Sequence, residues 1–532
     1  MYERNYQLKI PMNVEILIPD NDCVRLISQF VEEMDLTDLY ETYERMPSEK
    51  YASPAIMLKI MLYAYHEGTE TSSRTIEKNC RRDVNYMYLL EGRQAPDHAS
   101  IARFRTSHFA LCAEKYLARM TELLAQLDQI TDTEVFIDGT KIEANANKYT
   151  FVWKKSATKH QARFLRKTAL LVGEIIDRYD LKPLWNKIVK KKHVKQILKR
   201  LYELAKLEEL EYVSGRGHRK DQLQKDIEDL RSALEKIKEY ETKLHKCGNR
   251  NSYSKTDEDA TFMHMKDDHM MNGQLKPGYN VQHAVNSGYI VMVGLFPNPT
   301  DTLTIKPFWE QMENDLSLRF KRVVADAGYD SEENLKYFED KDIEAYIKPS
   351  DYEQRGTKKR LADIGHRSNM EYDKEHDCYI CRNGKRICKV GERKSKTASG
   401  YVRTETNYHC SECDGCPFRE KCMPGKNWKK PIESRFKSLT VSKEFDRLRE
   451  DVYSRIDTNE GKKLRMNRSI QAEGSFADIK GDSKFTRYLC RGNENVYAES
   501  VLYAMAHNLG WLHTRIQNGK LNDHLYELKE LA

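Results

Sequence analysis

The fold is decided by residues 134–141, whose sequence is EVFIDGTK. Residues 135–137 are β-branched or aromatic, which favours a short buried strand, and Gly139 predicts the point where that strand stops. Asp138 is therefore expected at the end of a strand. A carboxylate there contributes little to packing but is well placed to hold a metal ion at the edge of a sheet.

The same arrangement recurs at 321–329, KRVVADAGY, where an apolar strand is followed by Asp326 and a glycine. A third acid, Glu473, lies in 468–480, RSIQAEGSFADIK, which reads as a helix. A turn or cap is the commoner role for a single Asp beside Gly. Two strand-end aspartates and a helical glutamate together instead favour a site for hard cations, which can run two-metal phosphoryl chemistry.

The chain has 532 residues, which predicts several domains, and its formal charge of +7 is only mildly basic. Partners must therefore be inferred from local clusters. The absence of a long apolar run or an N-terminal signal predicts no membrane span and a cytoplasmic location. In that compartment twelve cysteines favour thiols or a bound metal over disulfides.

Patterning also predicts how the chain is divided. The expected regions are a helical N-terminal, DNA-binding domain at 1–130, a catalytic core built from 131–150, 257–350 and 436–515, a helical coiled-coil-like insertion at 151–256, a cysteine-rich zinc-binding insertion at 351–435, and a tail at 516–532.

The central region carries the order of elements that identifies the core. Residues 278–285 and 289–295 read as a β-hairpin, and Thr300–Asp301 then caps a helix. A strand ending in Asp326, a helix and a strand at 343–347 follow. This order predicts an α/β fold with a ribonuclease-H-like mixed sheet.

The N-terminal region contains PDHASIARFR at 96–105. Asp97 or Ser100 would cap a helix on which Arg103 and Arg105 face DNA phosphates, as in a helix-turn-helix-like reader. Contact with the DNA backbone is expected more strongly than reading of bases. The alternative is a plain helical bundle with solvated arginines.

The insertion holds a run of basic residues at 187–200 without any acid, including Lys190, Lys191 and Lys192. Further on, apolar residues follow a heptad pattern from Leu223 to Leu244. We expect an antiparallel helical hairpin that grips DNA backbone or pairs two subunits. The alternative is a solvated, salt-bridged arm.

Seven of the twelve cysteines lie between Cys378 and Cys422, in two groups of CxxC type. This spacing is typical of a structural zinc-ribbon-like site. The expected ligands are Cys381, Cys413, Cys416 and Cys422, with Cys378 and Cys410 as substitutes. The alternative is a set of reduced thiols without metal.

On the C-terminal helix, Glu473 and Lys480 would share one face. Glu473 could then bind metal while Lys480 reaches a phosphate, and Arg468 is a further candidate for phosphate contact. The alternative for both basic residues is ordinary surface charge.

With these motifs the sequence resembles a DDE-class transposase of bacterial insertion sequences. The stretches that carry the resemblance are IDGTK at 137–141, GYNVQ at 278–282, ADAGY at 325–329, the segment 473–480, the cysteine knot at 416–422 and the helical region 51–105. The resemblance implies a catalytic triad of Asp138, Asp326 and Glu473, with Lys480 at the position of a lysine that follows the glutamate in many relatives. Arg468 is one residue further from Glu473 than in the usual pattern.

The resemblance also implies the activity and its partners. The enzyme would cut insertion-sequence ends and join the 3′-OH strands to target DNA with two Mg²⁺ ions, for which Mn²⁺ can substitute. Terminal inverted repeats and target DNA would be bound by a homodimer at the bacterial nucleoid, without a membrane. The alternatives are a nuclease of the same fold without strand transfer, and an inactive DNA-binding regulator.

Overall fold

The computed structural model describes residues 14–43, 52–68, 71–182, 189–215, 218–265, 273–425 and 431–528. The chain folds into two compact units. Unit 1 comprises Met1–Thr140, Asn280–Thr486 and Glu494–Ala532, and unit 2 comprises Lys141–Tyr279 and Arg487–Asn493. Within the described ranges, no helix combines the length and the apolar character needed to cross a bilayer.

The N-terminal part of unit 1 is helical, and α4 (Pro54–Glu67) is its most buried helix. Ser53 caps α4, and Gly68 ends it in the left-handed conformation at φ 66°. Lys59 is buried within α4 and is neutralised by ion pairs with Glu32 and Glu91. The surrounding helices are α1 (Val14–Leu17), α2 (Cys23–Glu33), α3 (Thr37–Glu41), α5 (Ser73–Cys80), α6 (Val84–Leu89), α7 (His98–Arg103) and α8 (Ala113–Gln126).

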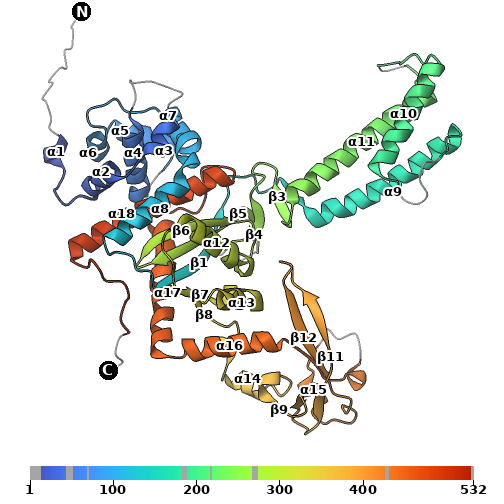
Figure 1. Ribbon diagram of the computed structural model, residues 1–532. Coiled ribbons are helices and arrows are strands. Elements are labelled where there is room, and N and C mark those ends of the chain that lie inside the picture. Colours follow the sequence, from blue (N-terminus) through green and yellow to red (C-terminus); the bar gives the residue numbers. More distant parts are fainter. Residues whose placement is uncertain are drawn as a thin grey trace, which may run out of the picture. The chain divides into compact units, whose positions relative to one another are not determined.

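The central sheet is mixed, with strand order β4-β5-β1-β7-β8 and β6 paired to β5 (Figure 1). Strands β1, β7 and β8 are parallel, whereas β4, β5 and β6 form antiparallel pairs. The strands are β1 (Glu134–Glu143), β4 (Thr261–His264), β5 (Leu275–Asn286), β6 (Tyr289–Phe296), β7 (Arg322–Ala325) and β8 (Glu344–Ile347). The mixed α/β class and the helical N-terminal region are thus confirmed.

The sequence predicted that strand β1 stops at Gly139, and this prediction was wrong. The strand continues to Glu143, although its pairing with β7 covers only Glu134–Ile137. Asp138 therefore lies inside β1, one residue beyond the paired segment, and Asp326 follows directly after β7. The two aspartates consequently reach the same edge of the parallel pair.

Helices pack on the sheet. α17 (Asn459–Ala477) contacts β6, β7 and β8, and α8 contacts β6. α18 (Asn493–Asn518) places Asn508 against β6, where its side chain bonds both the N–H and the carbonyl of Ile290 at 2.7 and 2.9 Å. The remaining helices of this region are α12 (Ile305–Asp315), α13 (Glu332–Asp340) and α16 (Lys443–Ile456).

The cysteine-rich part of unit 1 is a five-stranded antiparallel sheet of order β13-β12-β11-β10-β9. Cys378 and Cys388 face each other across β10 and β11 with Cα atoms 4.3 Å apart, and they form a disulfide. The expectation of thiols without disulfides was therefore wrong for this pair, because strand pairing places the two sulfurs within bonding reach. The strands and short helices are β9 (Glu371–Asp373), β10 (Cys378–Ile380), β11 (Arg386–Lys396), β12 (Val402–His409), β13 (Ser438–Val441), α14 (Lys358–Ala362) and α15 (Arg419–Cys422).

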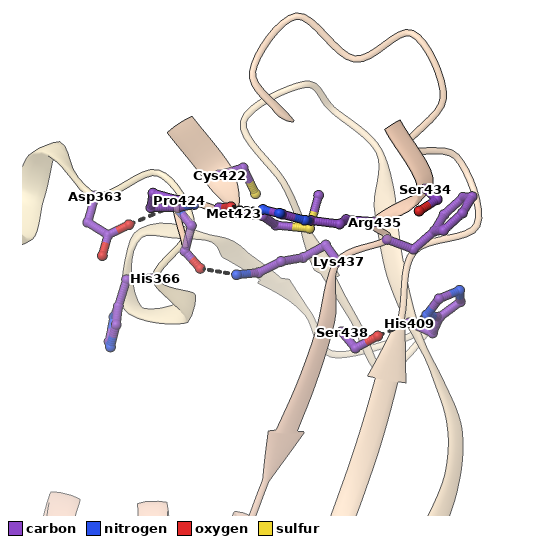
Figure 2. A pocket seen from close by; sticks show the side chains of 12 residues that line it. Asp363, His366, His409, Cys422, Met423, Pro424, Ser434, Arg435, Lys437 and Ser438 are labelled. Carbon is purple, nitrogen blue, oxygen red and sulfur yellow. Dashed lines mark hydrogen bonds between the residues drawn. The ribbon is translucent and has the colours of Figure 1, made fainter. Parts of the chain in front are cut away.

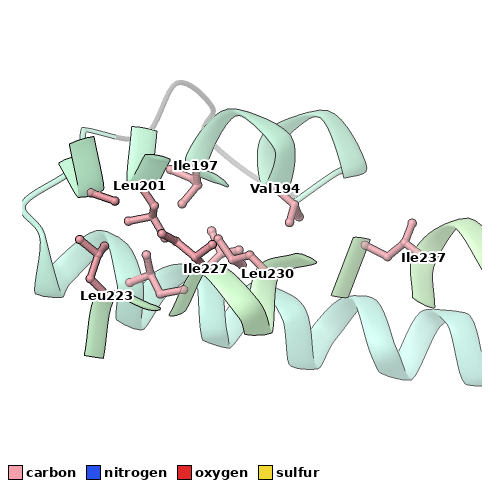
Figure 3. Packing of buried hydrophobic residues seen from close by; sticks show 10 residues of the cluster. Val194, Ile197, Leu201, Leu223, Ile227, Leu230 and Ile237 are labelled. Carbon is pink, nitrogen blue, oxygen red and sulfur yellow. The ribbon is translucent and has the colours of Figure 1, made fainter. Parts of the chain in front are cut away.

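In its described residues, unit 2 contains the helices α9 (Lys154–Arg178), α10 (Lys191–Leu207) and α11 (Gln222–Cys247), and the strand pair β2 (Phe151–Trp153) and β3 (Ser252–Ser254). The helices share one apolar core, in which Ile197 and Leu201 of α10 meet Ile227 and Leu230 of α11 (Figure 3). Most charged residues of these helices lie outside this core, although Asp226 of α11 is buried beside it and pairs with Arg178 of α9.

Candidate active site

Arg468 brings two of the predicted catalytic acids together. Its Nη2 donates a hydrogen bond of 2.8 Å to Oε1 of Glu473, and its Nη1 lies 3.9 Å from Oδ2 of Asp138. The side chains of Asp138 and Arg468 are largely buried, whereas that of Glu473 is 56 % exposed. Strand β1 and helix α17 therefore present their acids to one shared cation.

Asp326 is held in a fixed position directly after β7. Its Oδ1 accepts the N–H of Gly328 at 2.8 Å and so caps the short turn η4 (Ala327–Tyr329). Tyr329 in that turn is fully buried. Burial raises the pKa of Tyr329 well above its usual value, the nearby carboxylates of Asp301, Asp138 and Asp326 raise it further, and Arg468 opposes them.

The surroundings of Tyr329 reveal a fourth carboxylate, Asp301, which sequence reasoning had taken as the cap of a helix. That interpretation was wrong, because Asp301 begins a short turn, η3 (Asp301–Leu303), and α12 starts only at Ile305. Oδ1 of Asp301 accepts hydrogen bonds from Asn280 and Gln282 of β5 at 2.7 and 3.1 Å. A sequence signal was available in the polar residues of GYNVQ, which interrupt a buried strand.

Gly139 is required by close packing in this site. A Cβ atom at Gly139 would overlap the side-chain nitrogen of Gln282 and lie 3.0 Å from Oδ1 of Asp301. Gly139 therefore allows the side chain of Gln282 to approach the backbone closely, and it does not mark the end of the strand.

Helix α17 is fastened to the hairpin of β5 and β6. The buried His283 of β5 contacts Ser475 through its Nδ1 at 3.2 Å and stacks on Phe476 with ring centroids 4.0 Å apart. Gln471 accepts the N–H of Gly288 at 2.9 Å. Burial, with a smaller contribution from His507, lowers the pKa of His283 to about 3. A neutral histidine thus secures the helix that carries Glu473.

Lys480 does not lie on the α-helix that carries Glu473. α17 ends at Ala477, and Lys480 belongs to a π-helical turn, η8 (Asp478–Asp482). The expected sharing of one helical face was therefore wrong, because a π-turn changes the angle between successive residues. The side chain of Lys480 is partly exposed.

Metal ligation depends on the chemistry of these donors. Among the described residues, no group of three or more His, Cys, Asp or Glu side chains is arranged as a metal site. The acids near Tyr329 and on α17 nevertheless supply only oxygen donors, which fit Mg²⁺ or Mn²⁺. The guanidinium of Arg468 lies between Asp138 and Glu473 and is their shared positive partner.

The two N-terminal arginines have different surroundings. Asp97 caps α7 through the N–H of Ser100 at 2.7 Å, and Arg103 at the end of α7 is exposed. Arg105 is only 3 % exposed and donates to the carbonyl of Thr71 at 2.8 Å. Its expected contact with DNA was wrong, because the chain turns to a π-helix after Arg103 and directs Arg105 into the protein.

Basic residues of unit 2 lie on all three of its described helices, and the basic face of α9 is the one that sequence reasoning missed. Lys190, which precedes α10, and Lys192 on α10 are exposed, but Lys191 is partly buried and pairs with Glu241. Residues 154–167 of α9 contain no acid, which was the available sequence signal. The exposed basic residues there are Lys155, Lys159, Arg163, Arg166 and Lys167. Their positions fall on the face of α9 opposite its apolar residues, as helical periodicity requires.

The four predicted zinc ligands lie near one another beside the cysteine-rich sheet, one after β10, two after β12 and one in α15. The thiol of Cys422 has its pKa raised by burial and by the neighbouring Cys381, Cys413 and Cys416, while Lys437 opposes this. The N–H of Lys437 points to the sulfur of Cys413 at 3.4 Å. Cys378, predicted as a substitute zinc ligand, forms the disulfide with Cys388. The prediction that it can serve as a zinc ligand was therefore wrong.

A cavity of about 710 Å³ lies beside Cys422. Figure 2 shows Lys437 crossing it to the carbonyl of Gly365, a hydrogen bond of 2.6 Å, with Arg435 and His409 also on its wall. None of the predicted catalytic acids lines this cavity. It therefore belongs to the cysteine-rich sheet and not to the acidic site.

Comparison with protein families finds two matches. Residues 380–513 match the family described as "Transposase DDE domain", and residues 12–107 match "Transposase domain (DUF772)". The first match contains Glu473, Arg468 and the cysteines that follow residue 380, and it does not reach Asp138 or Asp326. Searches of curated proteins and of solved structures find no match.

Proposed function

The chain is a DDE-class transposase of the insertion-sequence type, and we propose that it cleaves the ends of its element and joins the freed 3′-OH strands to target DNA. The observation that carries this proposal is the shared contact of Arg468 with Asp138 and Glu473, beside the turn that holds Asp326. The parallel β1–β7 pair with acids at one edge also supports a ribonuclease-H-like core.

In the proposed mechanism, Asp138, Asp326 and Glu473 would hold two Mg²⁺ ions, or Mn²⁺ in their place. Bound metals of this kind activate the attacking oxygen and stabilise the leaving oxygen in phosphoryl transfer. The side chain of Arg468 must turn away from Glu473 to free that carboxylate. Arg468 can then bind a phosphate of the DNA strand, and Lys480, partly exposed on its turn, can bind another.

DNA binding in this proposal uses exposed basic residues from two parts of the chain. Arg103 at the end of α7 and Lys190 and Lys192 of unit 2 remain candidates for phosphate contact. The basic face of α9 adds a longer surface of the same charge. Because a transposase handles two element ends, we also propose that the protein acts as a homodimer on DNA.

A structural zinc ion in the cysteine-rich sheet is part of the proposal. The donors Cys381, Cys413, Cys416 and Cys422 fit zinc by chemistry and spacing. They would have to turn their sulfurs toward one centre. Metal analysis of the purified protein should find about one zinc per chain, lost in a Cys416→Ser variant. Zinc-free wild-type protein would leave these residues as thiols.

The test of the main proposal is a cleavage and joining assay. DNA carrying the element's own ends would be incubated with Mg²⁺ and a target plasmid, with wild-type protein and Asp326→Ala in parallel. We expect wild-type protein to produce cut ends joined to the plasmid. The variant should bind the ends but leave them uncut, since one metal ligand is missing.

Two other outcomes would replace the proposal. Cutting without joined product would indicate a nuclease without strand transfer. Binding without cutting in both Mg²⁺ and Mn²⁺ would indicate an inactive DNA-binding regulator.

A further inference from the structure

Asp301 occupies a buried polar network between the two strand-borne aspartates. Its Oδ1 receives hydrogen bonds from the side-chain amides of Asn280 and Gln282 at 2.7 and 3.1 Å. Nε2 of Gln282 also donates to Oδ1 of Asn280 at 2.9 Å. The amide of Gln282 therefore has one defined orientation, with its nitrogen toward Asp301 and its oxygen pointing away.

The other end of the Gln282 amide reaches the turn that follows Asp326. Oε1 of Gln282 accepts a hydrogen bond from the hydroxyl group of Tyr329, a residue that is fully buried. The next residue after Asp301 contacts the same turn, because Oγ1 of Thr302 donates to the carbonyl of Gly328 at 2.9 Å. The segment that begins at Asp301 thus holds the Asp326 turn through two separate connections.

The side-chain amide of Gln282 also packs against the backbone next to Asp138. Gly139, the residue after Asp138, approaches Gln282 so closely that a Cβ atom there would overlap Nε2. A Cβ at Gly328 would similarly lie 2.9 Å from Oδ1 of Asp326 and 3.5 Å from Oδ2 of Asp301. Gln282 and Asp301 therefore fill the space between the backbone segments that carry the two aspartates.

We propose that Asp301 is a positioning residue that sets the separation of the Asp138 and Asp326 carboxylates by fixing the orientation of Gln282. The inference rests on the proposed function, since it assigns Asp301 a part in the same catalytic centre. Removing its carboxylate takes one acceptor from each of two buried amides, which keep only the carbonyl of Asn298 for Asn280 and Oδ1 of Asn280 for Gln282. A buried N–H that loses its partner is strongly disfavoured. Gln282 would then rotate or take up water, and the Tyr329 connection to the Asp326 turn would be lost.

The experiment compares Asp301→Ala with Asp301→Asn. The asparagine keeps an oxygen at the Oδ1 position, so it should retain cleavage within about 10-fold of wild type. The alanine should lower the cleavage rate by about 10- to 100-fold, the range seen when supporting residues of metal sites are lost. DNA affinity and the Mg²⁺ concentration for half-maximal cleavage should stay at wild-type values in Asp301→Asn. Asp340→Ala on α13, an exposed carboxylate, is the matched control and should cleave normally.

A second variant tests the path through Tyr329. Tyr329→Phe removes the hydroxyl connection without touching Asp301, and it should also slow cleavage. Because both residues act through Gln282, the double variant Asp301→Ala/Tyr329→Phe should be no slower than the slower single variant. Independent, multiplying effects would contradict a shared path.

Hydrogen exchange gives a readout that does not depend on activity. Amide exchange in residues 326–330 should rise in Asp301→Ala and stay unchanged in Asp301→Asn. Unchanged exchange and wild-type cleavage in Asp301→Ala would overturn the proposal. An Asp301→Asn variant that cleaves only at a raised Mg²⁺ concentration would overturn it as well and make Asp301 a metal ligand. If wild-type protein fails to cut, the transposase proposal fails, whereas the exchange experiment still decides the role of Asp301.

Discussion

Arg468 donates a 2.8 Å hydrogen bond to Glu473 while its other terminal nitrogen lies 3.9 Å from Asp138. One guanidinium thus joins an acid from a strand to an acid from a helix more than three hundred residues away in the sequence. Its positive charge offsets the electrostatic repulsion between the two carboxylates. The same geometry makes Arg468 a competitor of any cation that these acids bind.

The first prediction concerns this competition. Arg468→Ala should bind Mn²⁺ more tightly than wild-type protein in the absence of DNA, because a positive charge is removed from Asp138 and Glu473. An ion pair of about 1 kcal/mol corresponds to a change of roughly 5-fold in the dissociation constant. Calorimetric titration with Mn²⁺ measures it, with Arg447→Ala on α16, which pairs with other acids, as the control. Unchanged or weaker binding in Arg468→Ala would contradict the competition.

The second prediction concerns two glycines beside the acids. Gly139→Ala should abolish cleavage, because its Cβ would overlap Gln282 and displace Asp138 or Asp301. Gly474→Ala, beside Glu473 within α17, is the matched control, since a Cβ there meets no atom within 4 Å. It should cleave normally and stabilise the helix by up to about 1 kcal/mol. Cleavage rates and thermal unfolding of both variants decide the question, and an active Gly139→Ala protein would refute the packing argument.

The third prediction concerns acid stability. Burial lowers the pKa of His283 to about 3, from an ordinary value of 6.5. The unfolded chain therefore binds a proton below pH 6.5 that the folded chain binds only near pH 3. The contribution of neutral His283 to the free energy of unfolding is fully present above pH 6.5. It is lost on acidification toward pH 3, by up to about 1.4 kcal/mol per pH unit.

His283→Asn should reduce this dependence on pH. The free energy of unfolding would be measured by denaturant titration at pH 7.5, 6.0 and 5.0, where the variant should show a shallower decline than wild type. The exposed His245→Asn on α11 is the control and should leave the decline unchanged. Parallel declines in wild type and His283→Asn would mean that His283 does not titrate as described.

The fourth prediction concerns the basic face of α9. Lys159→Gln/Arg163→Gln should weaken binding to duplex DNA and lower the slope of log affinity against log salt by about 2, one for each lost phosphate contact. Lys236→Gln/Lys243→Gln on α11 removes the same charge from lysines that pair with Glu239. Fluorescence anisotropy between about 50 and 200 mM salt should show little change for this control. Equal slopes for the two double variants would assign the effect to net charge alone.

The fifth prediction concerns the Cys378–Cys388 disulfide. It closes a loop of about ten residues across β10 and β11, so its loss should destabilise this sheet by up to about 3 kcal/mol. Limited proteolysis of Cys378→Ser/Cys388→Ser should show faster cutting within 371–441 than in wild-type protein under oxidising conditions. Cys80→Ser, a buried free cysteine of α5, serves as the control and should leave this region protected. Equal protection of this region in the double variant would show that the disulfide does not support the sheet.

The sequence by itself determined the local elements that carry the candidate site. Apolar runs followed by Asp and Gly predicted β1 and β7, and the hairpin of β5 and β6 followed from alternating apolar strands around a tight turn. The helix that carries Glu473 was also recognisable. Helices and strands can be predicted in this way because their patterns of apolar residues depend on neighbours in the sequence.

Only the tertiary structure decided which charged groups meet. Arg105 and Arg468 looked alike as basic residues near helices, yet Arg105 is buried against Thr71 and Arg468 joins Asp138 to Glu473. Asp301 looked like a helix cap, but strand β5 and the turn after β7 enclose it in a polar network. Such contacts join residues that are far apart in the chain, and they follow from sheet order and helix packing, which local sequence patterns do not encode.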